Sequence, residues 1–151
     1  MKNLLKWSAL CMALLLSTPA AASDLLMARV NRMFPEAMTL LQSAISSRGN
    51  TVTRLQQVNE NLQRREFQSD MYRVVYFGKH EEVRQATARN PQLIPFLPLN
   101  ITIFAEGDQA ILVTGHPKML REFFPDPELK PLFERWEKDV VEIMDEVREA
   151  H

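Results

Sequence analysis

The chain has 151 residues, with 18 Lys and Arg against 19 Asp and Glu, 46% apolar residues, four glycines and one cysteine. This length and this balance fit one ordinary globular domain. They exclude a disulfide-built mini-protein, a disordered tail, a collagen-like repeat and a strongly basic nucleic-acid binder, so we expect no nucleic-acid partner.

The first segment has the pattern of a secretory signal peptide. Lys2 and Lys6 precede an uncharged, Leu-rich run, which ends in Pro19 and the small residues 20–22. The uncharged run is shorter than the roughly 20 apolar residues of a membrane-spanning helix, although a retained anchor is the alternative interpretation. We expect cleavage after Ala22, a periplasmic or secreted location, and no stable membrane span afterwards.

Cleavage would also remove Cys11, the single cysteine of the chain. The remaining residues, 23–151, are then expected to form one domain without a disulfide, a thiolate nucleophile or a cysteine metal ligand. A domain of this size can bury about two-thirds of its unfolded surface, so a hydrophobic core alone can stabilise it.

The first half of this domain alternates between strand and helix patterns. The apolar run 25–30 predicts a strand, and apolar residues at three- and four-residue steps predict a helix from Phe34 to Ile45, which Gly49 ends. Residues 51–58 predict a second strand, followed by a short turn or helix around Leu62.

The middle of the chain contains the strand with the clearest composition. Residues 71–77 (MYRVVYF) are almost continuously apolar, which is typical of a strand covered on both faces. A short helix is predicted for 80–88. The following segment, 91–98 (PQLIPFLP), has three prolines in eight residues and predicts no regular structure.

The last part of the chain predicts a hairpin and a long helix. Residues 99–105 and 110–114 form the two strands of the hairpin, with Gly107 in the turn. A stripe of apolar residues from Leu129 to Val147 has helical spacing. Together the elements predict a two-layer, single-domain α+β fold, with a mixed sheet of about five strands, helices packed on it and a long C-terminal helix.

Several local motifs resemble those of the domain-of-unknown-function 302 (DUF302) family, over about residues 25 to 125. They are the Arg48-Gly49 turn, YRVVYF at 72–77, the stretch from Asn90-Pro91 to Leu97-Pro98, ITIFAEGD at 101–108, and Pro117. The resemblance implies a compact α+β domain that often associates as a homodimer and has no established activity. The chain departs from the family at Gly78-Lys79, where an Asn-Pro pair is usual, and at Leu99, where a cysteine is often found.

The sequence lacks the motifs of several common enzymes. It contains no G-x-G-x-x-G or Walker loop and no G-x-S-x-G elbow, and the position four after His80 is Arg84, so no zinc-protease motif is formed. His80 and His116 each follow a predicted strand, and they would bind an exported copper ion if both lay at the same end of the sheet. Solvent-exposed loop histidines are the alternative.

Tyr72 and Tyr76 lie four residues apart on one face of a predicted strand, where they can line a pocket for a small apolar or aromatic ligand. Packing beneath a helix is the alternative. The sequence therefore favours a non-enzymatic, exported module that binds a small ligand or a protein partner. A periplasmic metal or redox accessory protein and a carboxylate-dependent hydrolase are the other hypotheses, and no cofactor is identified.

Overall fold

A computed structural model describes residues 24–65 and 70–150 of the protein. The predicted signal peptide, with Cys11, lies outside these residues. Within them, no helix is long and apolar enough to cross a membrane. In chain order, the elements are β1 (Leu25–Val30), α2 (Phe34–Ser47), β2 (Thr51–Gln57), α3 (Val58–Gln63), β3 (Tyr72–Gly78), α4 (His80–Arg89), the 3₁₀-helix η1 (Pro91–Phe96), β4 (Leu99–Glu106), β5 (Gln109–Gly115), α5 (Met119–Phe123) and α6 (Lys130–Glu149).

The five strands form one sheet in the order β1-β5-β4-β3-β2. Every neighbouring pair is antiparallel, so the α+β class is confirmed but the sheet is not mixed as predicted. The reason is the path of α2. This helix carries the chain from β1 at one edge of the sheet to β2 at the other, so these two strands run parallel without ever becoming neighbours.

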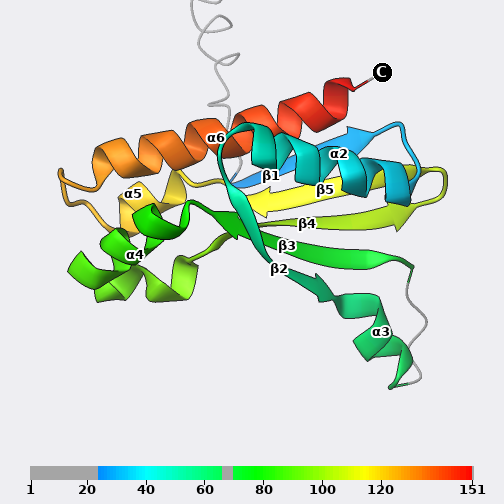
Figure 1. The fold of residues 1–151 in the computed structure, drawn as a ribbon, viewed down its shortest axis with the longest axis horizontal. Coiled ribbons are helices and arrows are strands. Elements are labelled where there is room, and N and C mark those ends of the chain that lie inside the picture. The colour runs from blue at the N-terminus through cyan, green and yellow to red at the C-terminus, as the bar shows by residue number, and fades with distance from the viewer. Residues whose placement is uncertain (1–23, 66–69, 151) are drawn as a thin grey trace, which may run out of the picture.

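Two helices cover one face of the sheet. Figure 1 shows α2 and α6 side by side above the strands. Their apolar stripes were predicted from helical spacing, and both stripes are buried. The stripe of α2 and the second half of the α6 stripe pack against the sheet. The central cluster is drawn from both helices and all strands except β2, and its fully buried members include Leu41, Ile45, Val75, Phe77, Ile101, Ile103, Leu112 and Ile143.

Most of the opposite face of the sheet is left exposed or half-exposed, although Ile111 of β5 is buried there. The strand β3 is therefore covered on one face only, and not on both faces as its composition predicted. We call this opposite face of the sheet the open face. Its side chains belong to the alternate positions along β1, β3, β4 and β5, where Arg29 and Glu106 form an ion pair. The less polar members include Leu25, Met27, Tyr72, Val74, Tyr76, Thr102, Phe104 and Val113.

A second, smaller cluster lies at one end of the sheet, among α4, η1, α5 and α6. It consists of Ala86, Leu93, Leu120, Leu129, Phe133 and Trp136. The long helix α6 thus contributes to both clusters. The 3₁₀-helix η1 corrects the prediction that this proline-rich segment is irregular, since a short 3₁₀ turn accepts Pro91 at its start.

The predicted turns are confirmed at two glycines. Gly49 has φ +69° after α2, and Gly107 has φ +59° between β4 and β5. Both values lie in the left-handed region that glycine adopts without strain. The alternation in β4 also holds, because Ile101 and Ile103 are buried while Thr102 and Phe104 face the open side.

Candidate functional site

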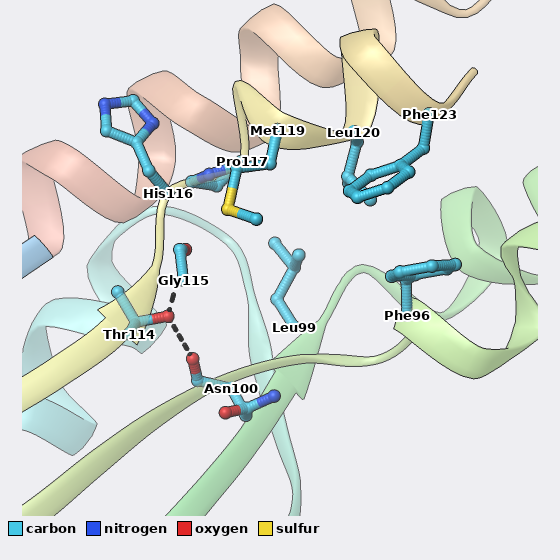
Figure 2. A pocket seen from close by; sticks show the side chains of 10 residues that line it. All are labelled: Phe96, Leu99, Asn100, Thr114, Gly115, His116, Pro117, Met119, Leu120 and Phe123. Atoms are coloured by element: carbon cyan, nitrogen blue, oxygen red, sulfur yellow. Dashed lines mark hydrogen bonds between the residues drawn. The ribbon is translucent and has the colours of Figure 1, made fainter. Parts of the chain in front are cut away.

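The sheet separates at the end where β4 begins and β5 finishes. The ladder between these two strands runs from the hairpin only as far as Thr102 and Val113. Beyond that point β4 stays paired with β3 as far as Leu99, and β5 stays paired with β1 as far as Gly115. Figure 2 shows the two strands diverging here, with η1 and α5 on the far side of the gap.

This gap continues into a pocket of about 200 Å³, which we call the end pocket. Most of its side chains are apolar, and those of Leu99, Met119 and Phe123 converge on the same space in Figure 2. None of its lining residues is Asp or Glu. The lining is formed by Phe96, Leu99, Asn100, Thr114, Gly115, His116, Pro117, Met119, Leu120 and Phe123.

Two aromatic rings from different segments meet at the rim of the end pocket. The rings of Phe96 on η1 and Phe123 on α5 stack with their centroids 6.1 Å apart. Phe124 packs edge-on against Phe96 at 5.4 Å. Phe96 is 42% exposed and Phe123 60% exposed, so both rings keep surface free for a further contact.

The floor of the end pocket is held by Thr114. Its hydroxyl lies 2.6 Å from the carbonyl oxygen of Asn100, to which it donates, and 3.3 Å from the carbonyl oxygen of Gly115. Thr114 is buried, and its hydroxyl thereby bridges the two strands where their ladder has ended. A threonine side chain replaces a backbone pair at this point.

His116 borders the end pocket, but its ring does not enter it. In Figure 2 the imidazole points away from the other lining side chains. Its Nδ1 accepts a hydrogen bond from the Lys118 amide at 3.3 Å, and its Nε2 lies 3.8 Å from Oε1 of Glu137 on α6. Arg121 also binds Glu137, at 2.9 Å, so the ring joins the turn before α5 to α6.

Burial lowers the pKa of His116 below its ordinary value, against the opposing charge of Glu137. Because Nδ1 accepts a hydrogen bond, the neutral ring carries its proton on Nε2, toward Glu137. In this structure the neutral ring of His116 therefore links the turn before α5 to α6.

The two histidines predicted as metal ligands lie at the same end of the sheet. Both β3 and β5 run antiparallel to β4, so they are parallel to each other and end on the same side. His80 is an exposed residue at the start of α4, whereas His116 is directed at α6. Within residues 24–65 and 70–150, no three or more His, Cys, Asp or Glu side chains are grouped to hold a metal ion.

Tyr72 and Tyr76 share a face of β3, as predicted, and that face is the open one. Tyr72 borders a broad hollow of about 700 Å³, together with Thr102, Phe104 and Val113. Arg54 lies over the ring of Tyr76 at 5.5 Å. Neither tyrosine contributes to the end pocket.

The match to known proteins covers most of the described chain. The family model "Domain of unknown function DUF302" matches residues 27–147. The chain belongs to the DUF302 family. The crystal structure of an uncharacterized conserved DUF302 protein from Bacillus stearothermophilus is similar to it, with a TM-score of 0.75 and 22% identity, over 84% of this chain and 100% of that one. No curated protein matches the sequence significantly.

The sequence did not single out the end pocket of this DUF302 chain, because the two aromatic residues at its rim come from segments without periodicity. Phe96 stands in the proline-rich stretch before β4, and Phe123 stands just before Pro125. An aromatic residue in a proline-rich connection cannot be explained by a helical or strand stripe. An aromatic residue in such a connection was the one sign of the pocket in the sequence, since exposed aromatics in loops often contact ligands.

Proposed function

We propose that this DUF302 protein is an exported, non-enzymatic binding module that takes a small, largely apolar ligand in the end pocket. The observation that carries the proposal is the apolar pocket of about 200 Å³ with two half-exposed phenylalanines at its rim. An apolar cavity of about 150 Å³ holds one benzene ring. The expected ligand is therefore the size of a single substituted ring.

The chemistry of the lining supports binding rather than catalysis. General acid–base catalysis needs a titratable group within hydrogen-bond reach of the reacting atoms. The end pocket is lined by no carboxylate, and the imidazole of His116 is turned toward Glu137 instead of the pocket. A carboxylate-dependent hydrolase would need a site other than the end pocket.

Export is proposed from the first 22 residues of the sequence alone. Their charged start, uncharged Leu-rich run and small residues before the cleavage position are typical of a secretory signal peptide. Cleavage after Ala22 would release the domain into the periplasm or the medium. A pocket for a diffusible, apolar small molecule suits a protein in that location.

Ligand binding is tested with the protein expressed from its full sequence in a bacterial host, where its intact mass also reports removal of residues 1–22. Titration calorimetry with one-ring aromatic compounds should detect binding. Phe96→Ala should weaken it about ten-fold, since a lost aromatic contact and its buried area together are worth about 1.4 kcal/mol.

The matched control is Ile94→Ala. Ile94 lies on the same 3₁₀-helix and is 57% exposed, but it does not line the end pocket. It should leave affinity unchanged. Equal weakening by the two variants, or no binding by any one-ring compound, would contradict the proposal.

The open face supports a second proposal, association with another copy of the chain. Leu25 is 56% exposed and Met27 67% exposed, and they continue a surface formed by Tyr72, Phe104 and Val113. Exposed apolar surface of this kind is typical of a protein–protein contact. On this proposal, Tyr72 and Tyr76 contact a partner protomer rather than a small ligand.

A further inference from the structure

The backbone at the diverging strands limits the chemistry of the ligand, provided that the proposed function holds. In an antiparallel sheet, successive residues of a strand form hydrogen bonds to opposite neighbours. The amide of Ala105 donates to Met71 of the β3 side at 2.9 Å. The even-numbered residues of β4, including Asn100, therefore direct their amides toward β5.

The same reasoning applies to the opposite strand. The amide of His116 donates to the carbonyl of Asp24 on the β1 side, at 2.8 Å. The preceding residue, Gly115, therefore directs its amide toward β4. Asn100 and Gly115 would form the next hydrogen-bonded pair of a regular ladder, but the pairing of β4 with β5 ends before them.

Two kinds of backbone group face the gap, namely carbonyl oxygens and amide N–H groups. The carbonyl oxygens of Asn100 and Gly115 both lie within hydrogen-bond distance of the Thr114 hydroxyl, which donates to the nearer one. The two amide N–H groups are donors, and both residues line the end pocket. A ligand that completes this site supplies a hydrogen-bond acceptor.

Gly115 leaves room for such an acceptor to approach the backbone. A Cβ atom placed on Gly115 would meet no other atom within 4 Å, so the space on the side-chain side of this residue is open. A glycine allows a ligand to come close to the main chain because no side chain shields it.

We propose that the ligand of the end pocket is a one-ring aromatic compound with a carbonyl or carboxylate oxygen. The ring contacts Phe96, Leu99 and Phe123, and the oxygen accepts from the Gly115 amide, with the Asn100 amide as the second donor. The lining contains no carboxylate that would repel an anionic oxygen, so the ligand can carry either a neutral carbonyl or a charged carboxylate.

The test compares ligands of equal shape that differ only in the acceptor. Acetophenone has a carbonyl oxygen where α-methylstyrene has a methylene group, and benzoate provides the charged acceptor. We expect acetophenone or benzoate to bind about ten-fold more tightly than α-methylstyrene, which is the usual effect of one well-formed hydrogen bond. In ¹H–¹⁵N spectra, the Gly115 amide proton should move downfield with the acceptor ligands only.

Gly115→Val provides the matched variant. Its side chain extends into open space, so the melting temperature should be preserved. Its branched carbon atoms lie next to the main chain and should hinder the approach of the oxygen to the amide, which removes the ten-fold advantage. Equal affinity for acetophenone, benzoate and α-methylstyrene, with no downfield shift at Gly115, would contradict the proposed acceptor oxygen. It would not contradict the proposed apolar pocket. Failure of all three compounds to bind would overturn both proposals.

Discussion

Because of the contacts of His116, the protonation state of its ring affects the stability of the folded protein. The side chain is only 14% exposed, and it faces Glu137 from α6, Lys118 and Arg121 from the segment around α5, and Asp24 from the residue before β1. Protonation would place a second N–H on Nδ1, where the Lys118 amide already donates. The folded protein therefore favours the neutral ring.

This preference predicts a pH dependence of stability with a defined sign. Burial lowers the folded-state pKa of His116 below the unfolded value of 6.5. Between the two values only the unfolded chain binds the proton, so the free energy of unfolding should fall as pH drops below about 6.5. Urea unfolding at several pH values measures it.

His116→Asn is the informative variant, since the asparagine oxygen can still accept from the Lys118 amide but does not titrate. It should flatten the decline in stability between neutral and mildly acidic pH. His80→Asn removes an exposed histidine and should follow the wild-type curve. If the decline in stability persists unchanged in His116→Asn, it is caused by a group other than His116.

At the scale of single residues, the sequence predicted which face of β4 is buried, because alternation is a local property. The prediction for β3 was wrong, since an almost continuous apolar run does not show that its Tyr72 face stays half-exposed. The direction of the His116 ring was not predictable, since it depends on Glu137 in a helix that the chain reaches only after α5. The pairing of Phe96 with Phe123 likewise depends on two connections that meet only in the folded state.

At the scale of elements, α6 has the largest structural role, because it covers both clusters. The buried residue Trp136 contacts Phe133 with ring centroids 5.7 Å apart. Its indole N–H donates to Oε1 of Glu82 on α4 at 2.7 Å. Arg135 binds the other oxygen of the same carboxylate at 2.9 Å, so α6 is tied to α4 by both packing and charge.

Trp136→Ala should lower the free energy of unfolding by about 3–5 kcal/mol, the usual cost of truncating a buried tryptophan. Chemical denaturation measures the loss. Trp136→Phe keeps a ring but removes the hydrogen bond to Glu82, and it should cost less. A near-neutral Trp136→Ala would mean that this end of α6 is not packed as described.

The long helices α2 and α6 were predictable, whereas the short helices α5 and η1 were not. The stripes of α2 and α6 repeat over several turns, so their pattern identifies a helix without tertiary information. The five-residue α5 and the six-residue η1 have no room for a repeating pattern, and the buried residues Leu93 and Leu120 hold them against the second cluster. The antiparallel sheet also required knowledge of which distant strands become neighbours.

At the scale of the whole molecule, the two faces of the sheet are unequal, and this predicts self-association. Sedimentation analysis should show a dimer. Met27→Lys should weaken it at least about 100-fold, because a symmetric contact brings like charges together in an apolar interface.

Met33→Lys is the control for the same substitution. Met33 is 60% exposed but precedes α2 and lies outside the open face, so its variant should dimerise normally. A wild-type protein that sediments as a monomer at all concentrations, or equal dissociation by both variants, would rule out this interface.

The first strand of the sheet, β1, lies next to the last, β5. A nascent chain therefore cannot complete its sheet until residues 109–115 have been synthesised, and the second covering helix, α6, follows only after that. Pairing between such distant segments is slow, because a long loop must close before any contact forms. If the chain is exported as proposed above, slow closure of the sheet would leave the polypeptide unfolded for longer during its passage across the membrane.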